Sequence, residues 1–474
     1  MIIRILLYFA MNAIGYGLMN IDAVNVQVVE VVFIVFYLIG MIFEFKVATH
    51  RYWLLPPTIF AVYTIINNMI SAWAFTRYNV GEWLYFSGDS MLVMRSAWYS
   101  MVASHVLWIG FYLIPDFKVT FFKKGQKIVG VSNALTYGFV AISLMAFFIG
   151  IRLGVYGYVR EKDAHDYSTY LKFAVNLGLL AIVFLTVYNY EDPVKKRLIY
   201  ILLVVYFFVG LGFGSKTTAV APMILVCIAL YMTKRKIKKQ FVLVIALGIF
   251  VSYLVIEPFR KYYTLVGDQY NVKDITEYVQ LYRDAFSIAE DVKGEDVESQ
   301  FLLDFLQRQS YVAPMSMTIY FADTKNYYVE DEWKHIALSP LYAIVPRFMW
   351  SSKPLANFGH WASYHIYESS EENSIGITPQ GYAYLSARMT GILLFFLLFG
   401  LMQKLMFNIL YLNPSYIPFY ILFLLEIAYP GEVPWTFLAG SIKSVVMVLP
   451  IIAFLVFTKF GILAKEEEAQ PVSS

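Results

Sequence analysis

The sequence predicts an all-α, polytopic membrane protein, and three observations lead to that fold class. Its 474 residues are 59% hydrophobic and only 15% charged, and a soluble chain of this length could not bury so much apolar surface. The apolar runs are long and unbroken rather than alternating, so they fit helices better than barrel strands. The formal net charge of +3 gives no reason to expect a nucleic-acid partner.

About twelve apolar windows reach the ~20-residue length that crosses a hydrocarbon core. The first of them, MIIRILLYFAMNAIGYGLMN, lacks a small-residue cleavage site, so we expect a span and not a signal peptide. The windows lie near residues 2–20, 27–45, 53–75, 91–114, 128–150, 168–190, 197–213, 217–233, 240–257, 388–406, 414–430 and 437–458.

Basic residues collect in alternate connections between these windows. Short loops rich in Lys and Arg stay in the cytoplasm, so both termini are predicted to be cytoplasmic. The residues in question are Lys46, Arg51, Lys118, Lys123, Lys124, Lys127, the DPVKKR and KRKIKK runs, Lys404, Lys459 and Lys465.

Under this topology a long interval, 258–387, lies outside the membrane. The chain then divides into an N-terminal membrane region of about nine spans (1–257), this external loop, and a C-terminal membrane region with about three spans and a cytoplasmic tail (388–474). Loops of this length are usually functional. Three amphipathic helices are expected within it, and the last, DEWKHIALSPLYAIVPR, is expected to break at Pro340 and Pro346.

Cations gather in the segments predicted to be external, beside span ends or amphipathic helices. The planar fork of arginine suits phosphate oxygens, and lysine adds a point charge, so one hypothesis is a site for a phosphate-bearing ligand. The alternative, that they pair with acidic residues or reach lipid headgroups, stays open. These cations are Lys216, Arg260, Lys261, Arg308, Arg347, Lys353 and Arg388.

Among the six histidines, His360 stands closest in sequence to Arg347 and Lys353. It is our candidate for a general base or for a group that orients a hydroxyl, and an interfacial histidine bonded to a neighbour is the plainer alternative. His360 and His365 lack further ligands at zinc spacing, and the chain has one cysteine, Cys227. We therefore expect no metal site. No nucleotide-binding motif is present, so no cofactor is expected.

Ionisable residues inside the windows are costly unless they face the bundle interior. Glu30 and Arg95 are expected to form a simple structural ion pair. A transporter would place such residues along a midplane path and show internal repeats, and the sequence contains no repeat.

The stretch IVPRFMWSSKP, followed by GITPQGYAYL, resembles elements of the Wzy-type oligosaccharide repeat-unit polymerases of bacterial surface polysaccharides. Those elements are a proline–arginine–x–x–tryptophan run, a lysine–proline pair and a threonine–proline pair just before a span. The large external loop between the ninth and tenth spans is also similar, as is the helix GSKTTAVAPMILVCIALYMTKRKIKK. That family more often has arginine where this chain has Lys216. The resemblance covers roughly residues 195–400.

The resemblance implies a GT-C-like membrane glycosyltransferase of the bacterial inner membrane, without metal or cofactor. Its donor and acceptor would be glycans on undecaprenyl pyrophosphate, and its other partners would be membrane lipid and a chain-length regulator protein. Arg347 and His360 would be catalytic, with His360 orienting or deprotonating the acceptor hydroxyl. The residues implied in binding the pyrophosphate are Arg260, Arg308 and Arg347, supported by Lys216 and Lys353.

Two other functions remain open. An O-antigen ligase, which moves finished glycan to another acceptor, would use similar parts. A flippase or transporter of polysaccharide precursors belongs to a different class, and its sensitive residues would lie at mid-membrane.

Overall fold

The computed structural model describes most of the chain, and the described residues form two compact units. Unit 1 comprises Met1–Lys118, Asp296–Leu412 and Phe423–Met447, and unit 2 comprises Val119–Glu295, Asn413–Leu422 and Val448–Ser474. The described ranges are 1–21, 25–78, 89–119, 126–153, 165–212, 215–237, 239–266, 275–291, 311–345, 349–350, 352–354, 358–368, 376–429, 433–458 and 461–465.

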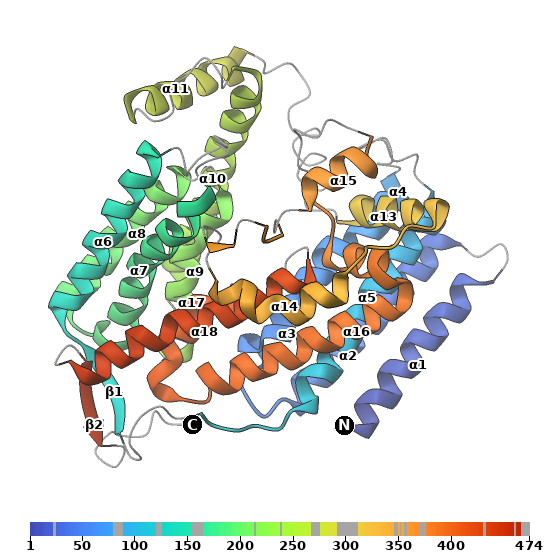
Figure 1. Cartoon of the computed structure of the whole chain (residues 1–474), viewed down its shortest axis with the longest axis horizontal. Coiled ribbons are helices and arrows are strands. Elements are labelled where there is room, and N and C mark those ends of the chain that lie inside the picture. The colour runs from blue at the N-terminus through green and yellow to red at the C-terminus, as the bar shows by residue number, and fades with distance from the viewer. Residues whose placement is uncertain are drawn as a thin grey trace. The chain divides into compact units, whose positions relative to one another are not determined.

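Helices make up almost all of the described structure (Figure 1). Those of unit 1 are α1 (Ile2–Met19), α2 (Val26–Val47), η1 (Tyr52–Leu54), α3 (Pro56–Thr64), η2 (Ile65–Ile70), α4 (Ser71–Tyr78), α5 (Ser90–Leu113), α13 (Val312–Lys325), α14 (Glu332–Ile344), α15 (Gly359–His365) and α16 (Pro379–Leu410). The elements of unit 2 are β1 (Gln126–Val131), α6 (Asn133–Arg152), α7 (His165–Asn189), α8 (Pro193–Gly212), α9 (Lys216–Met232), α10 (Lys239–Val266), α11 (Ile275–Asp291), η7 (Pro414–Tyr416) and β2 (Gly461–Lys465). Helices α17 (Ile417–Ala428) and α18 (Pro434–Phe457) contribute residues to both units.

Seven helices in the described ranges are long and apolar enough to cross a membrane. They confirm the coarser expectation of a helical, multi-pass membrane protein. Each of the predicted windows falls on a helix, but the count of about twelve, the GT-C-like fold and the division at 257 and 387 stay predictions. The seven are Ile2–Met19, Val26–Val47, Pro56–Arg77, Asn133–Arg152, Leu171–Asn189, Pro379–Leu410 and Trp435–Leu455.

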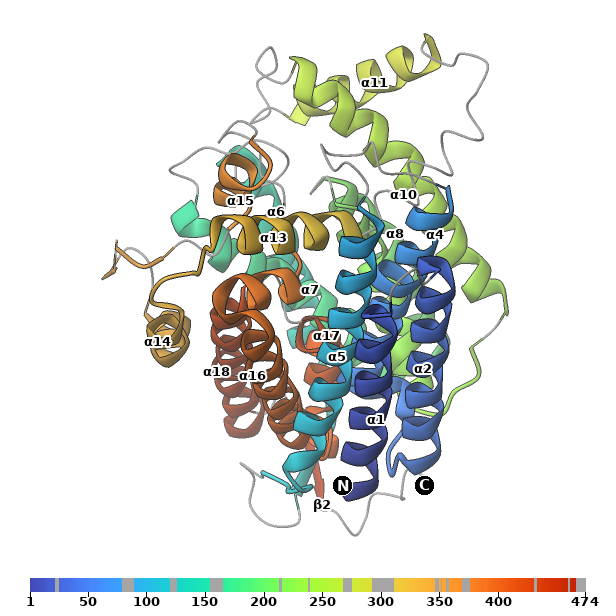
Figure 2. The same ribbon diagram turned by 90° about the vertical axis from the view of Figure 1, so that its right-hand side faces the viewer.

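Helices α5 and α16 form the centre of unit 1 and approach each other through glycines. A Cβ at Gly400 would lie 2.2 Å from the carbonyl oxygen of Leu107, and one at Gly110 would lie 2.4 Å from that of Leu397. Small residues at such crossings let helix backbones touch, which is how helices associate in lipid without a hydrophobic driving force between them. Figure 2 shows α1, α2 and α5 running alongside one another in the same unit.

A π-helical segment, η2, interrupts the long helix that runs from α3 to α4. Its wider turn leaves a backbone group available for an outside partner. The carbonyl oxygen of Asn67 accepts a hydrogen bond from the Tyr311 N–H at 3.0 Å, and the amide of Asn68 donates to Ser100 Oγ at 3.0 Å. Because Tyr311 directly precedes α13, the irregular turn fixes where that helix begins.

The two ends of unit 1 carry different charged groups. At one end, which we call the lysine end, Lys404 and His50 both bind the Asp116 carboxylate, His50 at 2.8 Å. Arg388 lies on the same helix as Lys404, about 24 Å away along the axis at ~1.5 Å per residue. That is most of the ~30 Å thickness of a hydrocarbon core. We call the end that carries Arg388 the arginine end.

Three helices of the predicted external loop lie at the arginine end. Helix α13 crosses the ends of α5 and α16 (Figure 2), and α14 and α15 pack beside it around a cluster of aromatic residues. The expected break of α14 at Pro340 is wrong: Pro340 lies inside the helix, which ends at Ile344. The ring of Pro340 is exposed, so it removes a backbone donor without having to fit into packed neighbours.

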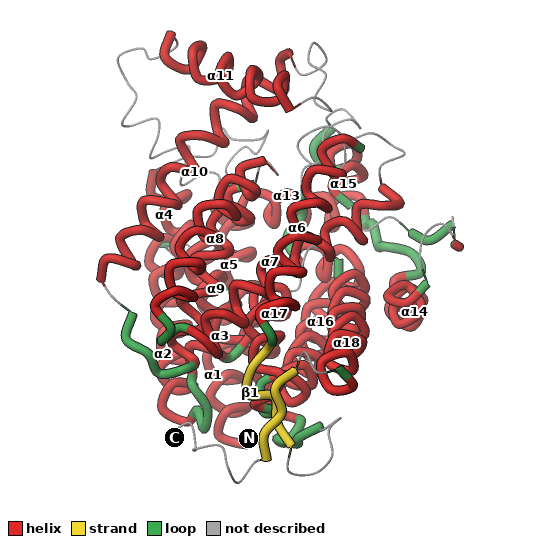
Figure 3. The backbone as a smooth tube through the Cα atoms, turned by 90° about the vertical axis from the view of Figure 1, so that its left-hand side faces the viewer, coloured by secondary structure: helices red, strands yellow, loops and turns green. Residues whose placement is uncertain are grey.

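Unit 2 is a second helical bundle with a small sheet. Helices α6 to α9 enclose an apolar core. Strand β1 pairs with β2 in an antiparallel sheet (Figure 3). This small sheet departs from the all-α fold class that the sequence predicted. The expected acidic amphipathic helix is confirmed as α11. It packs on α10, where the Tyr282 and Phe259 rings stack with centroids 4.0 Å apart, and it leaves Val279 exposed.

Candidate functional site

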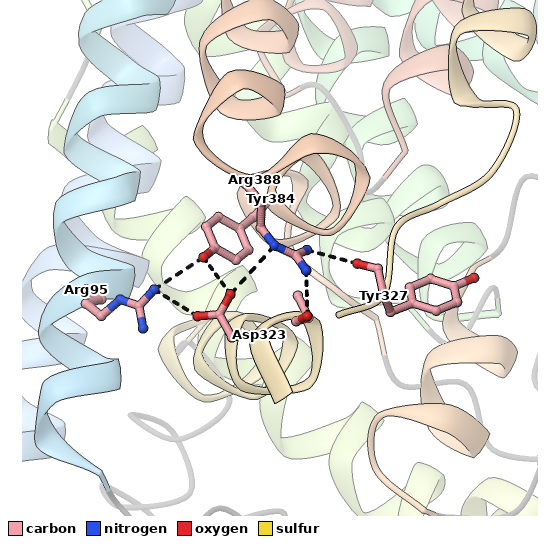
Figure 4. Close-up of polar contacts among 6 residues, drawn as sticks. Arg95, Asp323, Tyr327, Tyr384 and Arg388 are labelled. Atoms are coloured by element: carbon pink, nitrogen blue, oxygen red, sulfur yellow. Dashed lines mark hydrogen bonds and ion pairs between the residues drawn. The ribbon is translucent and has the colours of Figure 1, made fainter. Parts of the chain in front are cut away.

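A cluster of four side chains joins α5, α13 and α16 at the arginine end (Figure 4). Arg95 Nη2 lies 2.9 Å from the Asp323 carboxylate and donates to the Tyr384 hydroxyl at 3.2 Å. Tyr384 in turn donates to Asp323 at 2.8 Å. Arg388 Nε lies 3.7 Å from the same carboxylate. We call Arg95, Asp323, Tyr384 and Arg388 the arginine cluster.

The backbone at Arg388 is strained. Arg388 has φ of 54° and ψ of −140° where α16 kinks, a conformation that costs a residue with a Cβ of order 1–3 kcal/mol. Its guanidinium donates to the carbonyl oxygens of Tyr327 at 2.9 Å and Ala322 at 2.5 Å. These carbonyls lie at the C-terminal end of α13, where a cation complements the helix dipole. Arg388 therefore ties α13 to the kink.

The arginine cluster holds an excess of positive charge that is partly open to solvent. Two guanidinium groups share one carboxylate, and the side chains of Arg95, Asp323 and Arg388 are 33%, 37% and 21% exposed. Because Arg388 also satisfies two backbone carbonyls, Arg95 is the more available of the two guanidinium groups. Partly exposed arginine of this kind suits contact with a carboxylate or phosphate group.

The expected pairing of Glu30 with Arg95 is wrong. Glu30 instead accepts a hydrogen bond from the Thr76 hydroxyl at 2.9 Å, while Arg95 binds Asp323, far along the chain. The sequence shows which residues of the apolar windows are charged, but it does not show which distant residue each of them contacts. Arg95 and Asp323 were therefore missed as members of one cluster.

A second polar group at the arginine end is the carboxyl of Glu332, in the first turn of α14. It is 3% exposed, and its Oε2 accepts a hydrogen bond from the Tyr382 hydroxyl at 2.7 Å. Within the part of the chain that the structure describes, Oε1 has no hydrogen-bond partner. Burial raises the pKa of Glu332 to about 7, and the hydrogen bond from Tyr382 opposes that rise.

Tyr382, the partner of this carboxyl, belongs to a series of aromatic ring contacts that joins three elements. The Tyr382 ring meets the edge of Phe358 at a centroid distance of 4.9 Å, and Phe358 lies 4.5 Å from Trp361. Tyr327, in the connection from α13 to α14, lies 5.1 Å from Trp361. Phe358, Trp361 and Tyr327 are each partly exposed.

Lys353 holds the segment that follows α14. Its ammonium donates to the carbonyl oxygens of Tyr342 and, at 3.3 Å, Val345, in the last turn of the helix. The Trp350 ring lies 5.2 Å from the Tyr342 ring, so Trp350 and Lys353 both contact the last turn of α14. Whether Lys353 also supports a ligand stays a prediction.

His360, our candidate base, lies in α15 and is half-buried. His365 ends the same helix and is exposed. The roles predicted for His360 stay predictions. Among the described residues, no group of three or more His, Cys, Asp or Glu side chains could hold a metal ion.

The other predicted site residues are only partly described. Arg308 and Arg347 lie outside the described residues, as does the side chain of Arg260, whose backbone belongs to α10. Lys216 begins α9 and is half-buried. Since Lys216 and Arg260 belong to unit 2 and the others to unit 1, their convergence on one ligand stays a prediction.

Comparison with family models, with curated proteins and with solved structures finds no match for this chain.

Proposed function

We propose that this protein polymerises oligosaccharide repeat units carried on undecaprenyl pyrophosphate, at the outer face of the bacterial cytoplasmic membrane. The observation that carries the proposal is the arginine cluster. This cluster places two guanidinium groups against one carboxylate. It lies at the end of unit 1 opposite Lys404, and the distribution of basic loops assigns Lys404 to the cytoplasmic side. The motif resemblance between residues 344 and 385 supports the same function.

The proposed reaction needs fixed positive charge and no metal. A sugar hydroxyl of the acceptor attacks the anomeric carbon of the donor, and lipid pyrophosphate leaves with the bonding electrons. Negative charge grows on the leaving group, and preorganised cations stabilise it most where water is excluded. In this proposal Arg347, Arg308 and Arg260 bind the pyrophosphate with support from Lys353 and Lys216. His360 orients or deprotonates the acceptor hydroxyl.

A GT-C-like arrangement with about twelve spans and cytoplasmic termini belongs to the same proposal. Seven described helices meet the length and hydropathy of a span, and shorter apolar helices, such as Lys216–Met232 and Pro414–Ala428, supply further candidates. The partners in this proposal are the lipid-linked donor and acceptor, membrane lipid and a chain-length regulator protein.

The test is Arg347→Ala in bacterial cells that depend on this protein for their surface polysaccharide. Loss of one charge contact to a transition state costs about 10²–10³-fold in rate, so we expect polymer to disappear and single repeat units to remain. Because Arg347 is proposed to use its planar fork, Arg347→Lys should recover little. Glycan length is read by gel electrophoresis and the amount of protein by immunoblotting of membranes.

Lys334→Ala is the matched control, since Lys334 is an exposed cation of α14 that pairs only weakly, at 3.5 Å, with Asp331. It should leave the polymer unchanged. Normal long-chain polymer from Arg347→Ala would contradict the proposed function. A deletion that leaves no glycan attached, rather than single units, would favour the ligase, and substrate flux without covalent product would favour the transporter.

A further inference from the structure

The Glu332 carboxyl is an unusual group for the start of a helix. A carboxylate in the first turn ordinarily stays near the free backbone N–H groups and solvent, where the helix dipole stabilises it. Glu332 is instead buried to 3% exposure and bonded to Tyr382 of another helix. A buried polar atom without a partner, such as Oε1, costs about 1–3 kcal/mol. Such atoms are few in native structures, and a role toward a ligand or in a reaction is one explanation for them.

No cation in the described residues neutralises this carboxyl. The Glu332 carboxyl faces the hydroxyl of Tyr382 on α16, and Tyr327 lies next to Tyr382. Burial raises the pKa of Tyr327. On α14 itself, Lys334 pairs with Asp331. His335 bonds the Tyr342 hydroxyl at 3.0 Å. The carboxyl is thus held by a neutral donor and is able to take up or release a proton near neutral pH.

The aromatic rings that are linked to Tyr382 suit a sugar. A pyranose presents C–H groups on its faces and hydroxyls at its edge, so aromatic side chains beside a carboxylate complement both. Phe358, Trp361 and Tyr327 are partly exposed and connect through ring contacts to Tyr382, the residue that bonds Glu332.

We infer that Glu332, oriented by Tyr382, accepts the proton of the acceptor sugar's hydroxyl when that hydroxyl attacks. The inference rests on the proposed function and assigns a proton acceptor to it, which leaves His360 with the orienting role. A buried carboxyl with one oxygen fixed by a hydrogen bond and the other oxygen without a partner among the described residues can serve as a general base.

The acceptor oxygen forms a bond to the donor's anomeric carbon, and the bond from that carbon to the pyrophosphate oxygen breaks. The electron pair leaves with lipid pyrophosphate. The hydroxyl proton passes to Oε1 of ionised Glu332 and is released to water before the next transfer. A pKa of about 7 lies near the operating pH, where a general base is most effective.

The experiment uses full-length protein purified into nanodiscs. The probe is the undecaprenyl-linked repeat-unit fraction extracted from cells in which this protein has been deleted. Glu332→Gln keeps the size of the side chain and its acceptor for Tyr382. We expect its kcat to fall on the order of 100-fold or more, with KM changed by no more than a few-fold. Glu332→Asp should restore part of the lost rate.

The pH profile separates a base from a structural group. Ionised Glu332 is the active form, so the rate should fall as pH drops below its pKa. The hydrogen bond from Tyr382 lowers that pKa, and Tyr382→Phe should therefore move the acidic limb of the profile to higher pH. Asp331→Asn, one residue earlier and 67% exposed, is the matched control and should leave both rate and profile unchanged.

Two outcomes would overturn the inference: near wild-type kcat for folded Glu332→Gln, or an acidic limb unmoved by Tyr382→Phe. Where Glu332→Gln fails to fold, the Tyr382→Phe profile decides. If the wild-type protein itself makes no polymer from the lipid-linked fraction, the proposed function fails. If the wild-type protein polymerises and Glu332→Gln equals it, only the assignment of Glu332 fails.

Discussion

Replacing Arg388 with alanine and with glycine separates two opposing contributions of one residue. Its side chain ties α13 to α16 through two backbone carbonyls and contacts Asp323 at 3.7 Å. Its backbone, at φ 54° and ψ −140°, is unfavourable for any residue with a Cβ. Alanine removes the contacts and keeps the strain, whereas glycine removes both.

The magnitudes follow from these contacts. Hydrogen bonds from a charged group contribute about 1.5–3 kcal/mol each, and Arg388 is 21% exposed, so we take the lower half of that range. Arg388→Ala should lower the free energy of unfolding by about 3–4.5 kcal/mol. Arg388→Gly regains about 1–3 kcal/mol of strain and loses about 0.5–1 kcal/mol to backbone entropy. The glycine variant should therefore be more stable than the alanine variant by about 1 kcal/mol.

The assay is thermal unfolding of the three purified proteins in the same detergent, followed by tryptophan fluorescence. The expected order of stability is wild type, then glycine, then alanine. An alanine variant at least as stable as glycine would refute the strain argument. A wild-type-like alanine variant would refute the role of the guanidinium contacts.

Two further predictions concern packing and pH. Gly400→Ala should destabilise unit 1 by about 1–3 kcal/mol through overpacking, because its Cβ would meet a backbone carbonyl. Gly17→Ala, whose Cβ would meet nothing within 4 Å, should cost nothing in the same unfolding assay, and equal effects would contradict the packing argument. Burial acts to raise the pKa of Asp116, but bonds from Lys404 and His50 outweigh it and hold that pKa below its usual range. Its stabilising contribution is therefore present above the unfolded pKa of about 4 and lost as pH falls through the lower folded pKa. The stability difference between wild type and Asp116→Asn should shrink at about pH 3, and a difference unchanged from pH 7 would count against the linkage.

Parts of the candidate site could be predicted from sequence. The positions of Arg388 and Lys353 beside a span end and an amphipathic helix followed from hydropathy windows and proline signals, because apolar length and helix ends are local properties. The partners of these residues did not follow. Lys353 binds carbonyls of α14, and Arg388 binds those of α13, because the unpaired carbonyls at a helix end attract whichever cation the fold brings there.

The amino-acid sequence by itself determined that the protein is a helical membrane protein, where its apolar windows lie and which loops are rich in Lys and Arg. Each of these properties is a sum over neighbouring residues, so no knowledge of distant contacts is needed. Only the tertiary structure decided that Arg95 pairs with Asp323 rather than Glu30. It also decided that Glu332 is buried and that one of its oxygens has no partner among the described residues. Those outcomes depend on which helices pack together, and burial sets the cost of leaving a charged or polar atom without a partner.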